Sequence, residues 1–149
     1  PEDVPSKLLE ITNDLKETQK KAQQLADRLA AKEVDELIKG VIRENGISIL
    51  SAQVQADSIE QLRFMADQLK NKLGSGIIVL GTAVNGKVQL VAAVTGDLVE
   101  KGFHAGKIIR EVATITGGSG GGRPDMAQAG GKDSSKLKEA LHKVKEIMR

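Results

Sequence analysis

The chain has 149 residues, of which 40% are hydrophobic and 28% are charged, a balance typical of a folded protein rather than a disordered one. It contains no cysteine and two histidines, which excludes disulfides, thiolate zinc sites and a multi-histidine metal centre. Its two aromatic residues, both phenylalanine, are too few for a base-stacking platform that binds single-stranded nucleic acid.

Basic charge is concentrated near the end of a chain whose net charge is only +2. Residues 101–149 carry ten basic and five acidic side chains, so a surface there can attract polyanions. A solvated, lysine-rich helix face explains the same excess, and both interpretations stay open. No apolar run approaches the roughly 18 residues of a membrane-spanning helix, and the first residues lack the basic-then-apolar pattern of a signal segment. We therefore expect a cytoplasmic protein without a membrane partner, and its first residue, Pro1, indicates a fragment or a processed product.

The first 39 residues are expected to form a helical arm. No glycine or proline interrupts residues 6–39, and apolar or small residues recur there with heptad spacing. A helix of this length needs a partner, from a second copy, from elsewhere in a longer chain or from its own globular part. The candidate oligomerisation residues are Leu8, Ile11, Leu15, Ala22, Leu25 and Leu29.

A compact core is expected to follow. Asn45-Gly46 and Asn85-Gly86 each separate two apolar runs, which is typical of tight antiparallel hairpins. Residues 77–80 are apolar without alternation and predict a strand covered on both faces. Between the hairpins, Ser58 and Gln61 form a capping-box pattern that predicts a helix over residues 59–73.

Two further helices are predicted, one from about residue 104 to 116 and one starting near residue 133, separated by a glycine-rich loop over residues 117–131. The fold class is therefore α+β. We expect a long N-terminal coiled-coil-type helix over residues 1–39. An α/β sandwich over residues 40–149 would follow, with a mostly antiparallel sheet of four or five strands.

The glycine-rich loop matches neither common phosphate-binding motif. Asp133 follows Lys132 where a P-loop requires Ser or Thr, and Arg123 occupies the last glycine of the one possible dinucleotide-binding frame. Consecutive glycines still allow backbone N–H groups to converge on a ligand, and the Arg123 guanidinium suits phosphate. The loop is interpreted as an anion or polynucleotide contact, with a flexible linker as the alternative.

Three segments of the sequence, taken in order, resemble the C-terminal domain of bacterial alanyl-tRNA synthetases. They are residues 69–76, residues 98–107 and the run GGGRPDMAQAGG over residues 120–131. The resemblance extends over about residues 38–149. The same domain occurs more distantly in DHH-type phosphoesterases, where the loop typically reads GGGH, with His at the position of Arg123. The metal motif of those enzymes is absent from this chain.

The resemblance implies a parent ligase that charges tRNA with alanine, uses ATP, contains zinc and has a separate editing site. Neither catalytic site would lie in this chain, for which no cofactor, catalytic residue or metal ligand is expected. The implied partner is alanine tRNA, held at its elbow so that aminoacylation and editing act on one bound molecule. A homodimer through the arm or the globular part is also implied, and no DNA partner.

The candidate tRNA-binding residues are cationic side chains near the loop together with the loop itself. His104 is the weakest candidate, because it can simply cap the helix that follows it. Three functions stay open: a tRNA-binding domain, chiefly an oligomerisation module, or the nucleic-acid-binding domain of a DHH-type hydrolase. The candidate residues are Lys101, His104, Lys107, Arg110, Gly120, Gly121, Gly122, Arg123, Gln128 and Lys132.

Overall fold

The computed structural model describes residues 3–44 and 46–147, so Asn45 of the first expected turn lies outside the described residues. Within the first helix, the side chains of residues 3–14, 26, 27 and 30 also lie outside the described part. The chain divides into two compact units, residues 1–33 and residues 34–149.

The first unit is formed by helix α1, which spans Asp3–Ile38 and continues into the second unit. Three leucines of the heptad pattern are exposed to solvent: Leu15 at 58%, Leu25 at 59% and Leu29 at 69%. Ala22 is exposed as well, while the side chains of Leu8 and Ile11 lie outside the described part. These three leucines therefore expose apolar surface to solvent.

The second unit is built on a six-stranded sheet with strand order β1-β2-β3-β4-β6-β5. β2 and β3 are parallel and are joined by the crossover helix α2 (Ile59–Leu73), whereas the other four strand pairings are antiparallel. The turn between β3 and β4 has Asn85 at φ 53° and Gly86 at φ 76°. The strands are β1 Ile42–Glu44, β2 Ile47–Gln53, β3 Ile77–Val84, β4 Lys87–Val94, β5 Ser119–Gly122 and β6 Met126–Gly131.

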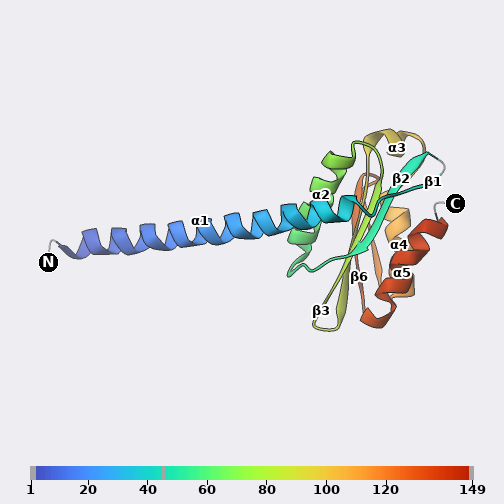
Figure 1. The fold of residues 1–149 in the computed structure, drawn as a ribbon. Coiled ribbons are helices and arrows are strands. Elements are labelled where there is room, and N and C mark those ends of the chain that lie inside the picture. The colour runs from blue at the N-terminus through green and yellow to red at the C-terminus, as the bar shows by residue number, and fades with distance from the viewer. Residues whose placement is uncertain (1–2, 45, 148–149) are drawn as a thin grey trace. The chain divides into compact units, whose positions relative to one another are not determined.

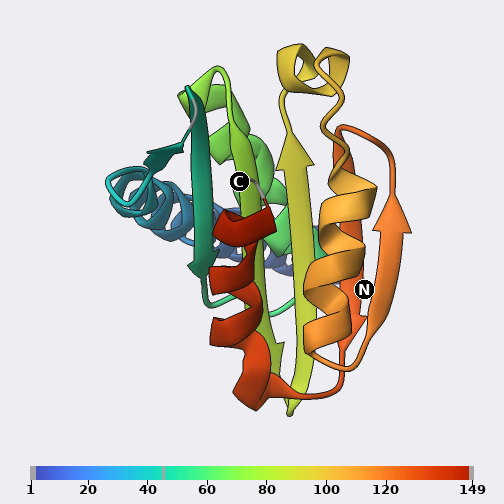
Figure 2. The ribbon, with the colours of Figure 1, turned by 90° about the vertical axis from the view of Figure 1, so that its right-hand side faces the viewer.

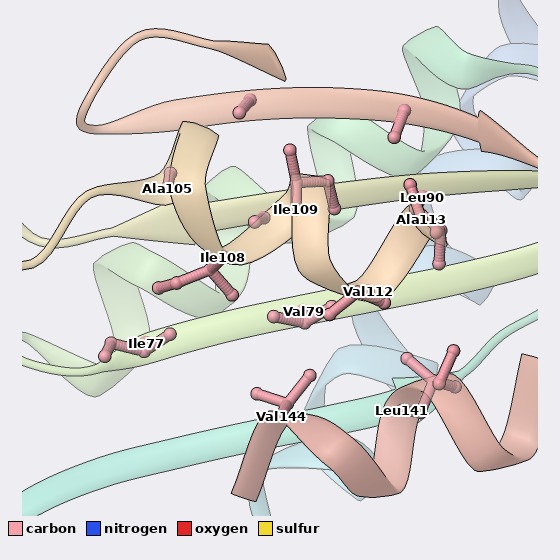
Figure 3. Close-up of a cluster of buried hydrophobic side chains, with 14 of the residues drawn as sticks. Ile77, Val79, Leu90, Ala105, Ile108, Ile109, Val112, Ala113, Leu141 and Val144 are labelled. Atoms are coloured by element: carbon pink, nitrogen blue, oxygen red, sulfur yellow. The ribbon is translucent and has the colours of Figure 1, made fainter. Parts of the chain in front are cut away.

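Helices cover both faces of this sheet (Figure 1). Helices α4 (Ala105–Ile115) and α5 (Leu137–Ile147) pack on one face, and α2 packs on the other against β3 and β4 (Figure 2). Figure 3 shows Ile77 and Val79 of β3 facing the apolar side chains of α4 and α5. Ile78, which lies between them in the strand, is also fully buried but is not a member of the hydrophobic cluster that Ile77 and Val79 form with α4 and α5. Coverage of both faces explains why β3 is apolar without alternation.

The ends of α2 are fixed by specific hydrogen bonds. The Ser58 hydroxyl accepts the Gln61 N–H at 3.3 Å, and the Gln61 side chain accepts the Asp57 N–H at 3.0 Å. This confirms the helix start that the capping-box pattern predicts. The turn after α2 is tied to the short helix α3 (Gly96–Glu100), because the hydroxyls of Ser75 and Thr95 donate to the Asp97 carboxylate. Those two hydrogen bonds hold the pKa of Asp97 below the ordinary value of 3.8.

The glycine-rich segment is not a loop. Residues 117–131 contain strands β5 and β6, so the sheet has six strands and the expected four or five was wrong. The glycines permit close packing of Gly118 against β6 and of Gly131 against Thr116 at the end of α4. A Cβ atom on Gly118 would lie 1.7 Å from the Gly130 carbonyl oxygen, and one on Gly131 would lie 2.2 Å from the Thr116 hydroxyl oxygen. Glycine is therefore a steric requirement at these positions and no sign of flexibility.

Gly118→Ala should destabilise the protein, because the added Cβ would overlap backbone atoms that cannot rotate away. We expect a loss of about 1–3 kcal/mol in the free energy of unfolding, measured by urea denaturation. Gly130→Ala is the matched control, because its Cβ would meet nothing nearer than the Val88 carbonyl oxygen at 3.7 Å. Equal effects of the two substitutions would contradict the steric explanation.

Candidate nucleic-acid interface

The turn between β5 and β6 is anchored by backbone hydrogen bonds at three residues. The Arg123 N–H donates to the Met126 carbonyl at 2.9 Å. The Pro124 carbonyl accepts the Ala105 N–H, and the Asp125 carbonyl accepts the Val94 N–H, both at 2.8 Å. These bonds join the turn to the start of α4 and to the end of β4. The exposed Arg123 side chain therefore projects from a backbone whose place is fixed.

A groove lies on the face of β6 that is turned away from α4. Ala127 and Ala129 belong to the core beneath α4, so Gln128 between them points to the opposite face, where it is exposed. One hollow of about 450 Å³ and a second of about 310 Å³ both include Gln128. We call their union the α2–β6 groove. Its wall is formed by one side of α2, where Ile59, Arg63 and Asp67 follow at four-residue intervals.

The α2–β6 groove combines charged and amide groups. Arg63 and Arg123 line it and are exposed, and the carboxylates of Asp67 and Asp125 line it with them. Gln89 of β4 also lines it, and its Oε1 atom is buried without a hydrogen-bond partner among the described residues. Such an acceptor is satisfied by a ligand hydroxyl or amino group or by water. Guanidinium groups suit phosphates, and amides suit ribose hydroxyls and base edges, so the groove matches the chemistry of a nucleotide unit.

The structure brings only part of the expected site together. Arg123, Gln128, Gly121 and Gly122 all line the α2–β6 groove. Lys132 lies at the opposite end of β6 from Arg123, and six strand residues span about 20 Å. These two cations therefore do not act on one small ligand.

The expected residues on and near α4 lie outside the groove lining. The Arg110 Nε donates to the Gly120 carbonyl at 3.3 Å, which ties α4 to β5. The His104 Nδ1 accepts the Gly106 N–H at 3.1 Å and so caps the start of α4. Lys101 and Lys107 are exposed.

Among the groove residues that the sequence did not predict are Gln89, Arg63 and Asp67. Gln89 had a detectable signal, because it is a polar residue between the apolar Val88 and Leu90 of a strand. No sequence pattern marked Arg63 and Asp67, because charged residues on the outer side of a helix are common. Whether they belong to a site depends on which residues lie opposite them in the fold. Only the fold places them across from Gln128.

The described residues, 3–44 and 46–147, contain neither a metal centre nor a membrane-spanning helix. Among the side chains that the structure describes, no three His, Asp or Glu residues are grouped so that they could hold a metal ion. No helix in these ranges is both long and apolar enough to cross a membrane.

Comparison with known proteins identifies the family. Residues 46–149 match the DHHA1 domain. The chain is 55% identical over 141 residues to the alanine–tRNA ligase of Geobacillus kaustophilus. That match covers 95% of this chain but 16% of the ligase, so the chain spans about a sixth of its relative's length.

Solved structures agree with this result. The C-Ala domain of Aquifex aeolicus alanyl-tRNA synthetase is 30% identical with a TM-score of 0.66, over 72% of this chain and 96% of that domain. CDC45 from Entamoeba histolytica, at 13% identity and a TM-score of 0.56 over 80% of this chain and 27% of CDC45, shares the fold alone. The chain belongs to the DHHA1 domain family, and within it to the C-terminal domains of alanyl-tRNA synthetases. The resemblance noted in the sequence is thereby confirmed.

His104 offers a test that separates a capping role from contact with RNA. His104→Ala should lower the free energy of unfolding by about 1 kcal/mol through loss of the cap, whereas His104→Asn should retain most of the stability. Thermal or urea unfolding measures both. If His104 serves only to cap α4, the His104→Asn variant should bind tRNA with the same affinity as the unsubstituted chain. A well-folded His104→Asn variant with several-fold weaker binding would assign the imidazole to the RNA contact instead.

Proposed function

We propose that this chain is a non-catalytic tRNA-binding domain of an alanine–tRNA ligase, working in the cytoplasm. It would hold the elbow of alanine tRNA and couple aminoacylation with editing of mischarged tRNA. The observation that carries the proposal is the match to the Aquifex C-Ala domain over 96% of that domain's length. ATP and zinc would belong to catalytic parts of the ligase that this chain does not contain.

The α2–β6 groove supports the proposal in chemical terms. A folded RNA corner presents phosphates, ribose hydroxyls and base edges rather than a readable major groove. Arg63 and Arg123 would contact phosphates, and Gln89 and Gln128 would hydrogen-bond to ribose or base groups. The glycine backbone at Gly121 and Gly122 allows close approach of the RNA. The outer cations Lys101, Lys107, Arg110 and Lys132 would add longer-range attraction, and the Gly120 carbonyl would hold the Arg110 side chain.

A salt-dependent titration tests the proposed function. The chain should bind intact tRNA more tightly than tRNA with a disrupted elbow or a plain RNA duplex. Arg123→Ala should weaken binding to intact tRNA about tenfold and make the dependence of affinity on salt shallower by about one phosphate contact. Fluorescence anisotropy at several salt concentrations measures both quantities.

Lys87→Ala is the control for that titration, because Lys87 is an exposed cation at the β3–β4 turn and does not line the groove. It should change affinity little. Equal binding of all three RNAs, or equal losses for Arg123→Ala and Lys87→Ala, would reject elbow recognition through the groove.

A second proposed function is homodimerisation through α1, favoured by the exposure of Leu15, Leu25 and Leu29. Leu15→Ser combined with Leu25→Ser should convert a dimer into a monomer, because the heptad seam would lose apolar area. Sedimentation velocity measures the mass. The control is Lys16→Ser combined with Gln24→Ser. Each of these exposed residues is next to one of the two leucines in sequence but lies outside the heptad seam, so the dimer should stay intact. A monomeric unsubstituted chain would refute the proposal.

A further inference from the structure

Helix α5 carries its charges on two separate sides. Lys138, His142 and Lys145 follow at intervals of four and three residues and share one side of the helix. Glu139 and Glu146 lie about 80–120° around the helix from Lys138 and Lys145, with Lys143 beyond them, so no carboxylate lies on the side that the two lysines share. The side with Lys138, His142 and Lys145 carries no acid and is therefore a candidate for contact with an anion.

The basic side of α5 faces β2 across a cleft of about 200 Å³. Lys138, His142 and Lys145 line it from the helix, and Ser51 and Gln53 line it from the strand. None of the described side chains that line this β2–α5 cleft is acidic. The two walls are joined by a hydrogen bond of 2.6 Å from the Ser51 hydroxyl to the Leu141 carbonyl. Figure 2 shows α5 and β2 running beside each other.

The backbone of β2 adds donors to the same place. β1 pairs with β2 only at residues 47–49, so the outer edge of β2 has no strand partner beyond them. The Val54 N–H donates inward to the Gly81 carbonyl, and strand alternation therefore turns the N–H groups of Ser51 and Gln53 outward. In the described part of the chain, no group accepts from these two N–H groups. The cleft thus offers cations and backbone donors together.

From this arrangement we infer that the β2–α5 cleft is a second binding surface for the phosphate backbone of RNA. The inference rests on the proposed RNA-binding function and adds a contact to it. Phosphates are the ligand chemistry that ammonium groups and backbone N–H donors share. An extended peptide could pair with the unpaired edge of β2, but two lysines without a facing acid favour the polyanion.

The cleft and the α2–β6 groove hold different stretches of RNA. Strand register aligns Gln53 of β2 with Gly81, Leu90 and Ala129 in one row across the sheet, so the two sites lie at the same level along the strands. Three strand spacings, about 14 Å, separate β2 from β6, and the sites lie on opposite faces. One short RNA stretch cannot occupy both.

A triple substitution tests the inference in the whole 149-residue chain: Lys138→Gln, His142→Gln and Lys145→Gln. Binding of intact tRNA and of a 12-base-pair RNA duplex is titrated at several salt concentrations. We expect about tenfold weaker binding to both RNAs and a slope of log affinity against log salt that is shallower by about two. Lys136→Gln combined with Lys143→Gln removes two exposed charges of the same segment outside the cleft and should change the slope by much less.

The two RNAs separate failure of this inference from failure of the proposed function. If the chain does not prefer intact tRNA but the triple variant still loses duplex binding, elbow recognition fails and the cleft inference stands. If the triple variant binds both RNAs as tightly as the unsubstituted chain, the cleft inference is overturned. The cleft inference is also overturned if the Lys136→Gln, Lys143→Gln control loses as much RNA affinity per charge removed as the triple variant. Net charge alone would then explain the weaker binding.

Discussion

The close approach of α4 to the β5–β6 hairpin is the constraint on which the site depends. Side chains on Gly118 or Gly131 would collide with backbone or with Thr116, so glycine lets the helix and the hairpin come together. The same contact holds the Arg123 turn against the first residue of α4. Because the hairpin is fixed on its α4 face, its other face is left open as the floor of the α2–β6 groove.

The sequence predicted the α+β class correctly, and its most reliable signals were local. Ser58 and Gln61 predicted the start of α2, because capping bonds involve residues that are neighbours in the chain. The glycine-rich segment was misjudged for a physical reason. Glycine is typical of loops, but here it is required by atoms of Thr116 and of the opposite strand. That requirement is visible only after α4 is placed.

The site was predicted less completely than the fold. Arg123 and Gln128 stand out in the sequence because they interrupt a run of small residues, and the structure places both in the groove. Arg63 comes from a helix about 60 residues earlier, so its contribution depends on how α2 crosses the sheet. Lys132 is near Arg123 in sequence but at the far end of β6, because an extended strand separates residues that a compact loop would bring together.

The strand order has a consequence for how this domain assembles. β6 lies between β4 and β5 although it follows β5 in the chain, so β5 is joined to the sheet only through β6. With glycine at three of its four positions, β5 has almost no side chains of its own to bury. The glycine-rich edge should therefore become ordered late in folding and exchange its amide hydrogens earlier than the strands at the centre of the sheet. A ligand in the groove would slow that exchange first at this edge.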